Sequence, residues 1–226
     1  MGNRYQRNMN TFSPAENASF KGFRICVVGC GGLGGYVIEM LGRLGIGHMT
    51  VVDGDVFDES NLNRQILSTE KLIGKEKALV AEARMKEVNG EVKITPIVAF
   101  LKEDNCRDLL KGHHLVVDAL DNMSSRKILA KACGELGIPL VHGAIAGWYG
   151  QVSTIMPGDN TMERLYRGED KEGIEVELGN PSFTPALVAS IQVAEVTKVL
   201  LGKGELLQNK LLTLDLLYHE YEVFEI

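Results

Sequence analysis

The sequence predicts an α/β fold, built on a doubly wound, mostly parallel sheet with antiparallel strands toward the C-terminus. Short apolar runs alternate with segments of helical spacing through the first two thirds of the chain, a pattern typical of parallel strands covered by helices. A glycine-rich turn separates the first apolar run from the first helical segment. Near the C-terminus, predicted strands follow one another without an intervening helix, which favours antiparallel pairing.

The individual elements follow from periodicity and from turn residues. The predicted helices cover residues 33–44, 75–89, 103–111, 124–136 and 184–201. The predicted strands cover residues 24–29, 48–53, 92–98, 114–119, 139–144, 151–156, 211–216 and 220–225. Residues 55–68 and 157–180 lack a clear period and are predicted as loops, and residues 1–20 as a polar arm. Residues 21–226 then form a single domain.

Bulk properties exclude several classes of protein. The chain has 226 residues and a formal net charge of -6, so a basic face for nucleic acid is not expected. It shows neither a signal peptide nor an apolar run long enough to span a membrane. Its four cysteines form no C-x-x-C pair, so no zinc site is expected and a reduced, cytoplasmic setting is the simplest interpretation.

The glycine turn predicts a nucleotide site. Residues 29–34 read Gly-Cys-Gly-Gly-Leu-Gly, a G-x-G-x-x-G pattern between a predicted strand and a predicted helix, where phosphate can approach backbone N–H groups. Asp53 ends the next strand and can accept hydrogen bonds from ribose hydroxyls. This context indicates a Rossmann-like sheet. The turn alone does not distinguish ATP from a nicotinamide cofactor.

Further motifs follow in order along the chain. They are the glycine turn, Val-Val-Asp-Gly-Asp at 51–55, Asn-Leu-Asn-Arg-Gln at 61–65, Gly-Lys-Glu-Lys-Ala at 74–78 and Asp-Ala-Leu-Asp-Asn at 118–122. Together they resemble the MoeB/ThiF/HesA family, the bacterial relatives of ubiquitin-activating enzymes. The resemblance extends from Arg4 to about Leu216 and implies adenylation of the C-terminal glycine carboxylate of a small ubiquitin-like sulfur-carrier protein.

The resemblance also implies roles for individual residues. Arg64 and Lys77 would contact phosphates, Asp121 would hold Mg²⁺, and Arg7 would reach the ATP of the partner subunit in a homodimer. The residues implied to bind the nucleotide are Gly29, Gly31, Gly32, Gly34, Asp53, Asp55, Asn61 and Asn122. The implied cofactors are ATP and Mg²⁺, and the implied partners are a carrier ending in Gly-Gly and a separate sulfur donor.

The chemistry of adenylation calls for such charges. A carboxylate must meet a polyphosphate, so positioned Arg and Lys side chains and a metal ion would stabilise the transferring group. Each charge also has a structural interpretation. Lys77 could be an exposed helix lysine, Arg64 a solvated loop arginine, Asp121 a helix N-cap, and Arg7 a residue of a disordered arm.

The chain departs from the family pattern at its cysteines. Many relatives carry zinc-binding C-x-x-C pairs and a cysteine in the loop before the last long helix, whereas residues 157–185 here contain none. Of the four cysteines present, Cys106 is predicted to be the most exposed and none is expected to act as a nucleophile; the others are Cys26, Cys30 and Cys133. Adenylation is therefore predicted without covalent transfer through a cysteine.

Two further segments have competing interpretations. His142 ends a predicted strand and is interpreted as a structural histidine, with a place in the site as the alternative. Residues 141–151 are rich in small residues and resemble the family strand that meets the carrier tail, with a β-hairpin as the alternative.

Three other functions compete with carrier adenylation. One is a relative that applies the same adenylation chemistry to a modified tRNA base, as the threonylcarbamoyladenosine dehydratases are thought to do. Another is a nicotinamide-dependent oxidoreductase, which leaves Arg64, Lys77 and Asp121 without a role. The third is a non-catalytic nucleotide-binding scaffold. The sequence does not name the carrier, which thiamine, molybdopterin or tungstopterin, cysteine and siderophore routes could each supply.

Overall fold

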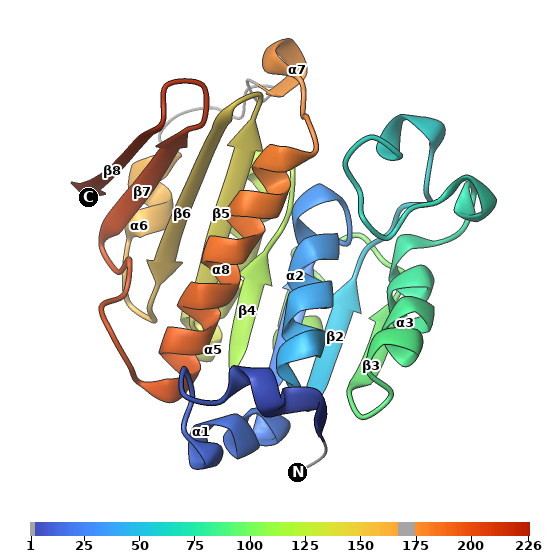
Figure 1. The fold of residues 1–226 in the computed structure, drawn as a ribbon. Coiled ribbons are helices and arrows are strands. Elements are labelled where there is room, and N and C mark those ends of the chain that lie inside the picture. The colour runs from blue at the N-terminus through green and yellow to red at the C-terminus, as the bar shows by residue number, and fades with distance from the viewer. Residues whose placement is uncertain (1–2, 167–174) are drawn as a thin grey trace.

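A single eight-stranded sheet forms the centre of the molecule (Figure 1). The computed structural model describes residues 3–166 and 175–226. The strand order is β3-β2-β1-β4-β5-β6-β7-β8, and neighbouring strands from β3 to β5 are parallel whereas those from β5 to β8 are antiparallel. The strands are β1 (Arg24–Val28), β2 (His48–Val52), β3 (Lys93–Ile97), β4 (Leu115–Asp118), β5 (Leu140–Ala146), β6 (Tyr149–Ile155), β7 (Lys210–Asp215) and β8 (Glu220–Glu225). The predicted fold class is confirmed.

Helices cover both faces of the parallel part. On one face lie α2 (Gly32–Leu44), α3 (Lys77–Val88) and α8 (Phe183–Leu201), and on the other α4 (Cys106–Leu110), α5 (Met123–Leu136) and α6 (Thr161–Leu165). Successive residues of β1 alternate between the two cores: Ile25 and Val27 join the first, Cys26 and Val28 the second. Burial on both faces explains why this strand is a continuous apolar run.

Helix α8 is long and apolar enough by composition to cross a membrane. In this fold half of its residues are buried inside the protein, where it packs along α2, β5 and β6 (Figure 1). The core helix of a globular protein passes the same test of length and hydropathy, and the buried Val188, Ala189 and Val196 belong to the first core.

The N-terminal arm is partly helical and packed on the domain. It contains a 3₁₀-helix, Asn3–Asn8, and α1 (Pro14–Ser19), whose capping box joins Ser13 to Glu16. Further short 3₁₀-helices are Phe20–Gly22, Glu59–Asn61 and Glu70–Leu72. Tyr5 is 5% exposed and accepts a hydrogen bond from Asn89 at 2.8 Å. Burial of one aromatic side chain and local capping therefore give order to a segment that composition alone marks as polar.

The prediction of a structureless loop over residues 157–180 is wrong for two parts of it. The described residues include α6 and a short helix α7 (Glu175–Leu178), while residues 167–174 lie outside the described part. Met162 of α6 is 4% exposed and belongs to the second core. A helix of five residues with two adjacent buried side chains, Thr161 and Met162, leaves no detectable period in the sequence.

Candidate active site

The glycine turn brings the N-terminus of α2 to the carboxyl end of β1. Gly29 has φ +99°, and a Cβ atom there would lie 2.4 Å from the carbonyl oxygen of Ala119. A Cβ atom on Gly34 would lie 1.8 Å from the carbonyl oxygen of Gly29. These two positions require glycine for packing between strand and helix, and they leave the first turn of α2 open to an anionic ligand.

Asp53 ties the end of β2 to this turn. Its carboxylate accepts hydrogen bonds from the backbone N–H groups of Cys30 at 2.7 Å and Asp55 at 2.8 Å. Burial raises the pKa of Asp53 above its ordinary value, an effect partly opposed by these backbone hydrogen bonds. The carboxylate therefore fixes the turn at the edge of the site, where it can also meet ribose hydroxyls.

A cavity opens over the carboxyl ends of β1, β2 and β4. It brings together residues from all five motifs of the sequence. The predicted residues that line it are Gly29, Gly31, Gly32, Asp53, Asp55, Arg64, Lys77, Asp121 and Asn122. The position matches the edge of a doubly wound sheet where ligands bind.

Two of the cavity's charged side chains, those of Lys77 and Arg64, are at least partly buried. Lys77 is 7% exposed, and its Nζ lies 3.3 Å from the Oδ2 of Asp55, so the alternative of an exposed helix lysine is wrong. Arg64 is half-buried and donates through Nη1 to the Ser60 carbonyl oxygen at 2.9 Å. Within the described part of the chain, Asp55 is the one side chain paired with Lys77, so the ammonium group retains donors for phosphate.

Asp121 is exposed on the loop between β4 and α5. The N-cap of α5 is Asn122, whose Oδ1 accepts from the Ser125 backbone N–H at 2.9 Å, so the N-cap interpretation of Asp121 is wrong. Within the described residues, no three or more His, Cys, Asp or Glu side chains gather as a metal site. The absence of such a cluster is compatible with Mg²⁺, which is commonly held by one or two carboxylates together with substrate phosphates.

Three predicted residues lie outside the cavity lining. Gly34 packs α2 against β1, as described above. The side chain of Asn61 is 9% exposed and its Oδ1 accepts from the Asp58 N–H at 3.1 Å, which caps the 3₁₀-helix Glu59–Asn61. Arg7 is exposed on the N-terminal 3₁₀-helix, which contacts the C-terminal ends of α2, through Tyr5 beside Gly45, and of α3, far from the glycine turn (Figure 1).

Other lining residues were not among the predicted ones. The buried side-chain oxygens Oε1 of Gln65 and Oδ1 of Asn180 have no hydrogen-bond partner among the described residues, which suits a ligand that donates. Phe100 is 58% exposed beside Gly54, and Arg126 lines the cavity from α5. Gln65 ends a quoted motif and could have been found, whereas Phe100 and Asn180 carry no local sequence signal.

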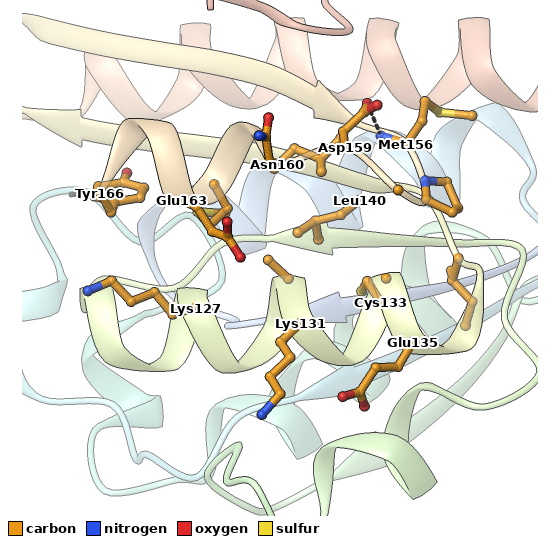
Figure 2. Close-up of a pocket in the computed structure, with 17 residues that line it drawn as sticks. Lys127, Lys131, Cys133, Glu135, Leu140, Met156, Asp159, Asn160, Glu163 and Tyr166 are labelled. Carbon is orange, nitrogen blue, oxygen red and sulfur yellow. Dashed lines mark hydrogen bonds between the residues drawn. The ribbon is translucent and has the colours of Figure 1, made fainter.

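A larger cavity, of about 700 Å³, lies between α5 and α6 (Figure 2). Its floor is apolar, with Leu140 and Cys133 among the lining residues, and its rim carries side chains of both signs such as Lys131 and Glu163. None of the predicted site residues lines it. Size alone is therefore a poor guide to the candidate active site in this fold.

All four cysteines are free and buried. Cys106 is the most exposed of the four, as predicted, yet only 5% of it is exposed; its Sγ lies 3.5 Å from the Glu103 carbonyl oxygen. Burial raises the pKa of Cys26 to about 12, and it also raises the pKa values of Cys30 and Cys133. Buried thiols with raised pKa values are poor nucleophiles.

His142 has a structural place, as the preferred interpretation predicts. Its ring is fully buried, and Nδ1 lies 2.7 Å from Oδ2 of Asp118. Burial lowers its pKa, although Asp118 opposes that shift. The surrounding residues 141–151 form the β5–β6 hairpin, with Gly147 at φ +55° in the turn, while Ile145 lines the cavity.

Comparison with known proteins supports the motif analysis. The SAMP-activating enzyme E1 of Haloferax volcanii is 35% identical, covering 97% of this chain and 83% of its own. The sulfur carrier protein adenylyltransferase of Thermus thermophilus is 36% identical, over 95% and 83%. The molybdopterin-synthase adenylyltransferase of Salmonella typhimurium is 32% identical, over 94% and 87%.

The solved structure of Escherichia coli MccB with ATP shares the fold. Its TM-score is 0.87 at 21% identity, covering 99% of this chain and 72% of that one. The ThiF family model matches residues 5–226. Since the match includes the glycine turn and all the charged motifs of the site, and curated relatives exceed 30% identity along most of their length, the chain belongs to the ThiF family.

Proposed function

We propose that this protein adenylates the C-terminal glycine carboxylate of a small ubiquitin-like sulfur-carrier protein, using ATP and Mg²⁺. Its relatives are named as adenylyltransferases, so nucleotidyl transfer is its class of reaction. The observation that carries the proposal is the convergence of Arg64, buried Lys77 and exposed Asp121 with the glycine turn in one cavity. A hydride-transfer site has no use for this set of charges.

The reaction joins two anions. A carboxylate oxygen of the carrier forms a bond to the α-phosphorus of ATP, and the bond from that phosphorus to the bridging oxygen of the β-phosphate breaks. The products are an acyl adenylate and pyrophosphate. Arg64 and Lys77 would stabilise charge on the transferring and leaving groups, because preorganised cations in a partly dry site act strongly. Bound Mg²⁺, held through Asp121, would supply further neutralisation of the phosphates.

The nucleotide would lie along the glycine turn. Backbone N–H groups at the start of α2 face the cavity formed by Gly29, Gly31 and Gly32 and would hold phosphate oxygens. Asp53 would hold the ribose, at the end of β2 where its carboxylate is already oriented by two backbone hydrogen bonds. The unpartnered oxygens of Gln65 and Asn180 would accept from ligand donors.

We propose a homodimer in which Arg7 of one subunit serves the site of the other. The N-terminal 3₁₀-helix, which carries Arg7, lies at the opposite end of α2 from the glycine turn of its own chain (Figure 1), so Arg7 can act only across an interface. An Arg7→Ala subunit mixed with an Asp121→Ala subunit should recover up to about a quarter of the activity if subunits exchange freely, because one site then keeps both residues. Inactive mixtures of confirmed mixed dimers would mean that Arg7 acts within its own chain, and an Arg7→Ala protein that is active by itself would place Arg7 outside the reaction.

The sulfur donor would be a separate protein. The described residues hold only buried cysteines, so the acyl adenylate would be attacked directly by an external sulfur nucleophile. A thioester or acyl persulfide between this protein and its carrier, detected by mass spectrometry without reductant, would contradict this part of the proposal and leave adenylation intact.

The test is ATP–pyrophosphate exchange with Mg²⁺ in the presence of candidate carriers ending in Gly-Gly. We expect exchange with one carrier, and none when that carrier lacks its final glycine. A cytoplasmic carrier of a cofactor-biosynthesis route is the expected partner. Absence of exchange with every carrier, despite bound ATP, would favour the tRNA-modifying or scaffold alternatives, and binding of NADH in place of ATP would favour an oxidoreductase.

A further inference from the structure

A buried polar network connects the candidate active site to α6, on the face of the sheet opposite α2 and α8. Its centre is the hydroxyl of Tyr166, the residue that ends α6. That oxygen lies 3.0 Å from Nε2 of His142, 2.9 Å from Nη1 of Arg126 and 2.9 Å from Nε2 of Gln151. Figure 2 shows Tyr166 at one end of the cavity between α5 and α6, beyond Glu163.

Every polar atom at this centre has a consistent donor or acceptor role. Burial lowers the pKa of His142 and raises that of Tyr166, so the ring is neutral and the hydroxyl keeps its proton at neutral pH. The His142 Nδ1–H then donates to Asp118, and its Nε2 accepts from the Tyr166 O–H. The two lone pairs of the Tyr166 oxygen accept from Arg126 and Gln151, which uses the full capacity of a tyrosine hydroxyl.

The other side of the network holds the loop that carries Asp121. Asp118 ends β4 and its Oδ1 accepts from the Leu120 backbone N–H at 3.0 Å. The guanidinium of Arg126 donates through Nε to the Leu120 carbonyl oxygen at 3.2 Å and through Nη2 to the same atom. The N–H and the carbonyl oxygen of Leu120 are thus both hydrogen-bonded to side chains of the network. Arg126 contacts Tyr166 directly, and Asp118 connects to it through His142.

Neighbouring packing makes this connection stiff. Arg126 is 8% exposed, and His142 and Asp118 are fully buried. The rings of His142 and Tyr166 pack edge to face, with centroids 5.6 Å apart. Because fully satisfied polar networks in a protein interior resist rearrangement, a shift of the loop at 120–122 is transmitted to α6 more readily than through apolar contacts alone.

We propose that Tyr166 is a positioning residue that couples nucleotide binding at the 120–122 loop to the order of α6. The inference rests on the proposed nucleotide site. With nucleotide and Mg²⁺ bound, Asp121 would be fixed as a ligand of the metal ion. The adjoining Leu120 carbonyl oxygen accepts hydrogen bonds from Arg126, and Arg126 donates to the Tyr166 hydroxyl. Occupancy of the site therefore stabilises α6 against local opening, while a vacant site leaves it less protected.

Hydrogen exchange measured by mass spectrometry on the full chain tests this coupling. Two peptides are followed with and without ATP and Mg²⁺: one over the glycine turn, residues 29–35, and one over residues 156–166. In the unmodified protein we expect the ligand to slow exchange in both, by about tenfold in α6, the scale of one net hydrogen bond. In Tyr166→Phe we expect the glycine turn to keep its protection and α6 to lose the ligand-dependent part.

Tyr5→Phe is the matched control. Its hydroxyl also accepts a buried hydrogen bond, from Asn89, but at the other end of the sheet. This variant should keep the ligand-dependent protection of α6, which separates coupling from the general loss of a buried tyrosine hydroxyl. Arg126→Lys, which keeps the charge but loses the two-pronged contact with Leu120, should behave like Tyr166→Phe.

The two proposals fail in distinguishable ways. Protection of the glycine turn without any change in α6, or equal α6 protection in Tyr166→Phe and the unmodified protein, would overturn the coupling and leave the nucleotide site intact. If Tyr5→Phe also lost the ligand-dependent protection of α6, the effect of Tyr166→Phe would reflect the general loss of a buried tyrosine hydroxyl, and the coupling would be overturned. Lack of protection at the glycine turn in the unmodified protein would overturn both proposals.

Discussion

The parallel part of the sheet and its antiparallel C-terminal edge differ in how far their residues are exposed to solvent. Strands β1, β2 and β4 are buried along nearly their whole length, and the polar groups of the candidate site gather where their carboxyl ends meet the cavity, with Asp53 and Asp121. The β7–β8 hairpin is different: every residue of the edge strand β8 is exposed, including Tyr221, Val223 and Phe224.

The difference follows from how each type of strand is connected. Parallel strands need crossover helices, which cover both faces and leave the strand ends as the place for polar chemistry. An antiparallel hairpin needs no crossover, so its faces stay open to solvent. Substitutions at the parallel strand ends should therefore change activity, those inside the parallel strands should change stability, and those on β8 should change neither greatly.

The largest effect is expected from Asp121→Ala. Among the described residues, the exposed carboxylate accepts a side-chain hydrogen bond only from Asn122 Nδ2, at 3.3 Å, so the fold should persist while the Mg²⁺ ligand is lost. We expect ATP–pyrophosphate exchange to fall by about 10³-fold or more, the scale of metal-ion stabilisation of a phosphoryl group. Exchange within a factor of about three of normal, at saturating Mg²⁺, would remove Asp121 from the site.

Lys77→Ala and Arg64→Ala should each lower the exchange rate by about 10²-fold, the scale for one preorganised charge stabiliser. Lys86→Ala is the matched control on the same helix: Lys86 is exposed and pairs with Glu82 at 2.8 Å. We expect Lys86→Ala to leave kcat unchanged. Equal losses in Lys77→Ala and Lys86→Ala would mean that net charge, rather than position in the cavity, governs the rate.

Gly34→Ala and Gly134→Ala compare a required glycine with a dispensable one. A Cβ atom on Gly34 would overlap the Gly29 carbonyl oxygen, whereas one on Gly134 in α5 meets nothing within 4 Å. Denaturant unfolding should show a loss of about 3 kcal/mol for Gly34→Ala and a gain of about 0.5–1 kcal/mol for Gly134→Ala. A stable Gly34→Ala variant would mean that α2 can shift away from β1.

Val27→Thr and Val223→Thr make the same near-isosteric change in the two regions. Val27 is fully buried in β1, so its new hydroxyl should cost about 1–3 kcal/mol of unfolding free energy. Val223 is 54% exposed on β8, so its change should stay within about 0.5 kcal/mol. A loss at Val223 as large as at Val27 would show that β8 is covered in solution, and sedimentation analysis would then identify a self-association.

Local features of the sequence were enough to predict most of the sheet and the glycine turn. Alternating buried runs and helical spacing are properties of neighbouring residues, so β1, β2, β4 and the long helices could be placed before any contact was known. The motif residues Arg64, Lys77 and Asp121 were also identifiable, because their order and spacing along the chain are visible without the fold. The burial of Lys77 could not be predicted, because an isolated lysine on a helix is expected to be exposed to solvent.

Only the tertiary structure decided which of these groups meet and what supports them. Asn61 caps a short helix through Asp58 and so does not line the cavity, Gly34 packs a helix against a strand, and the helix that carries Arg7 packs at the far end of the sheet. Tyr166, His142 and Arg126 come from three elements and share one hydroxyl. The sequence by itself determined the periodic elements and the motif chemistry; long-range packing, which no local window contains, decided burial, hydrogen-bond partners and the boundary of the site.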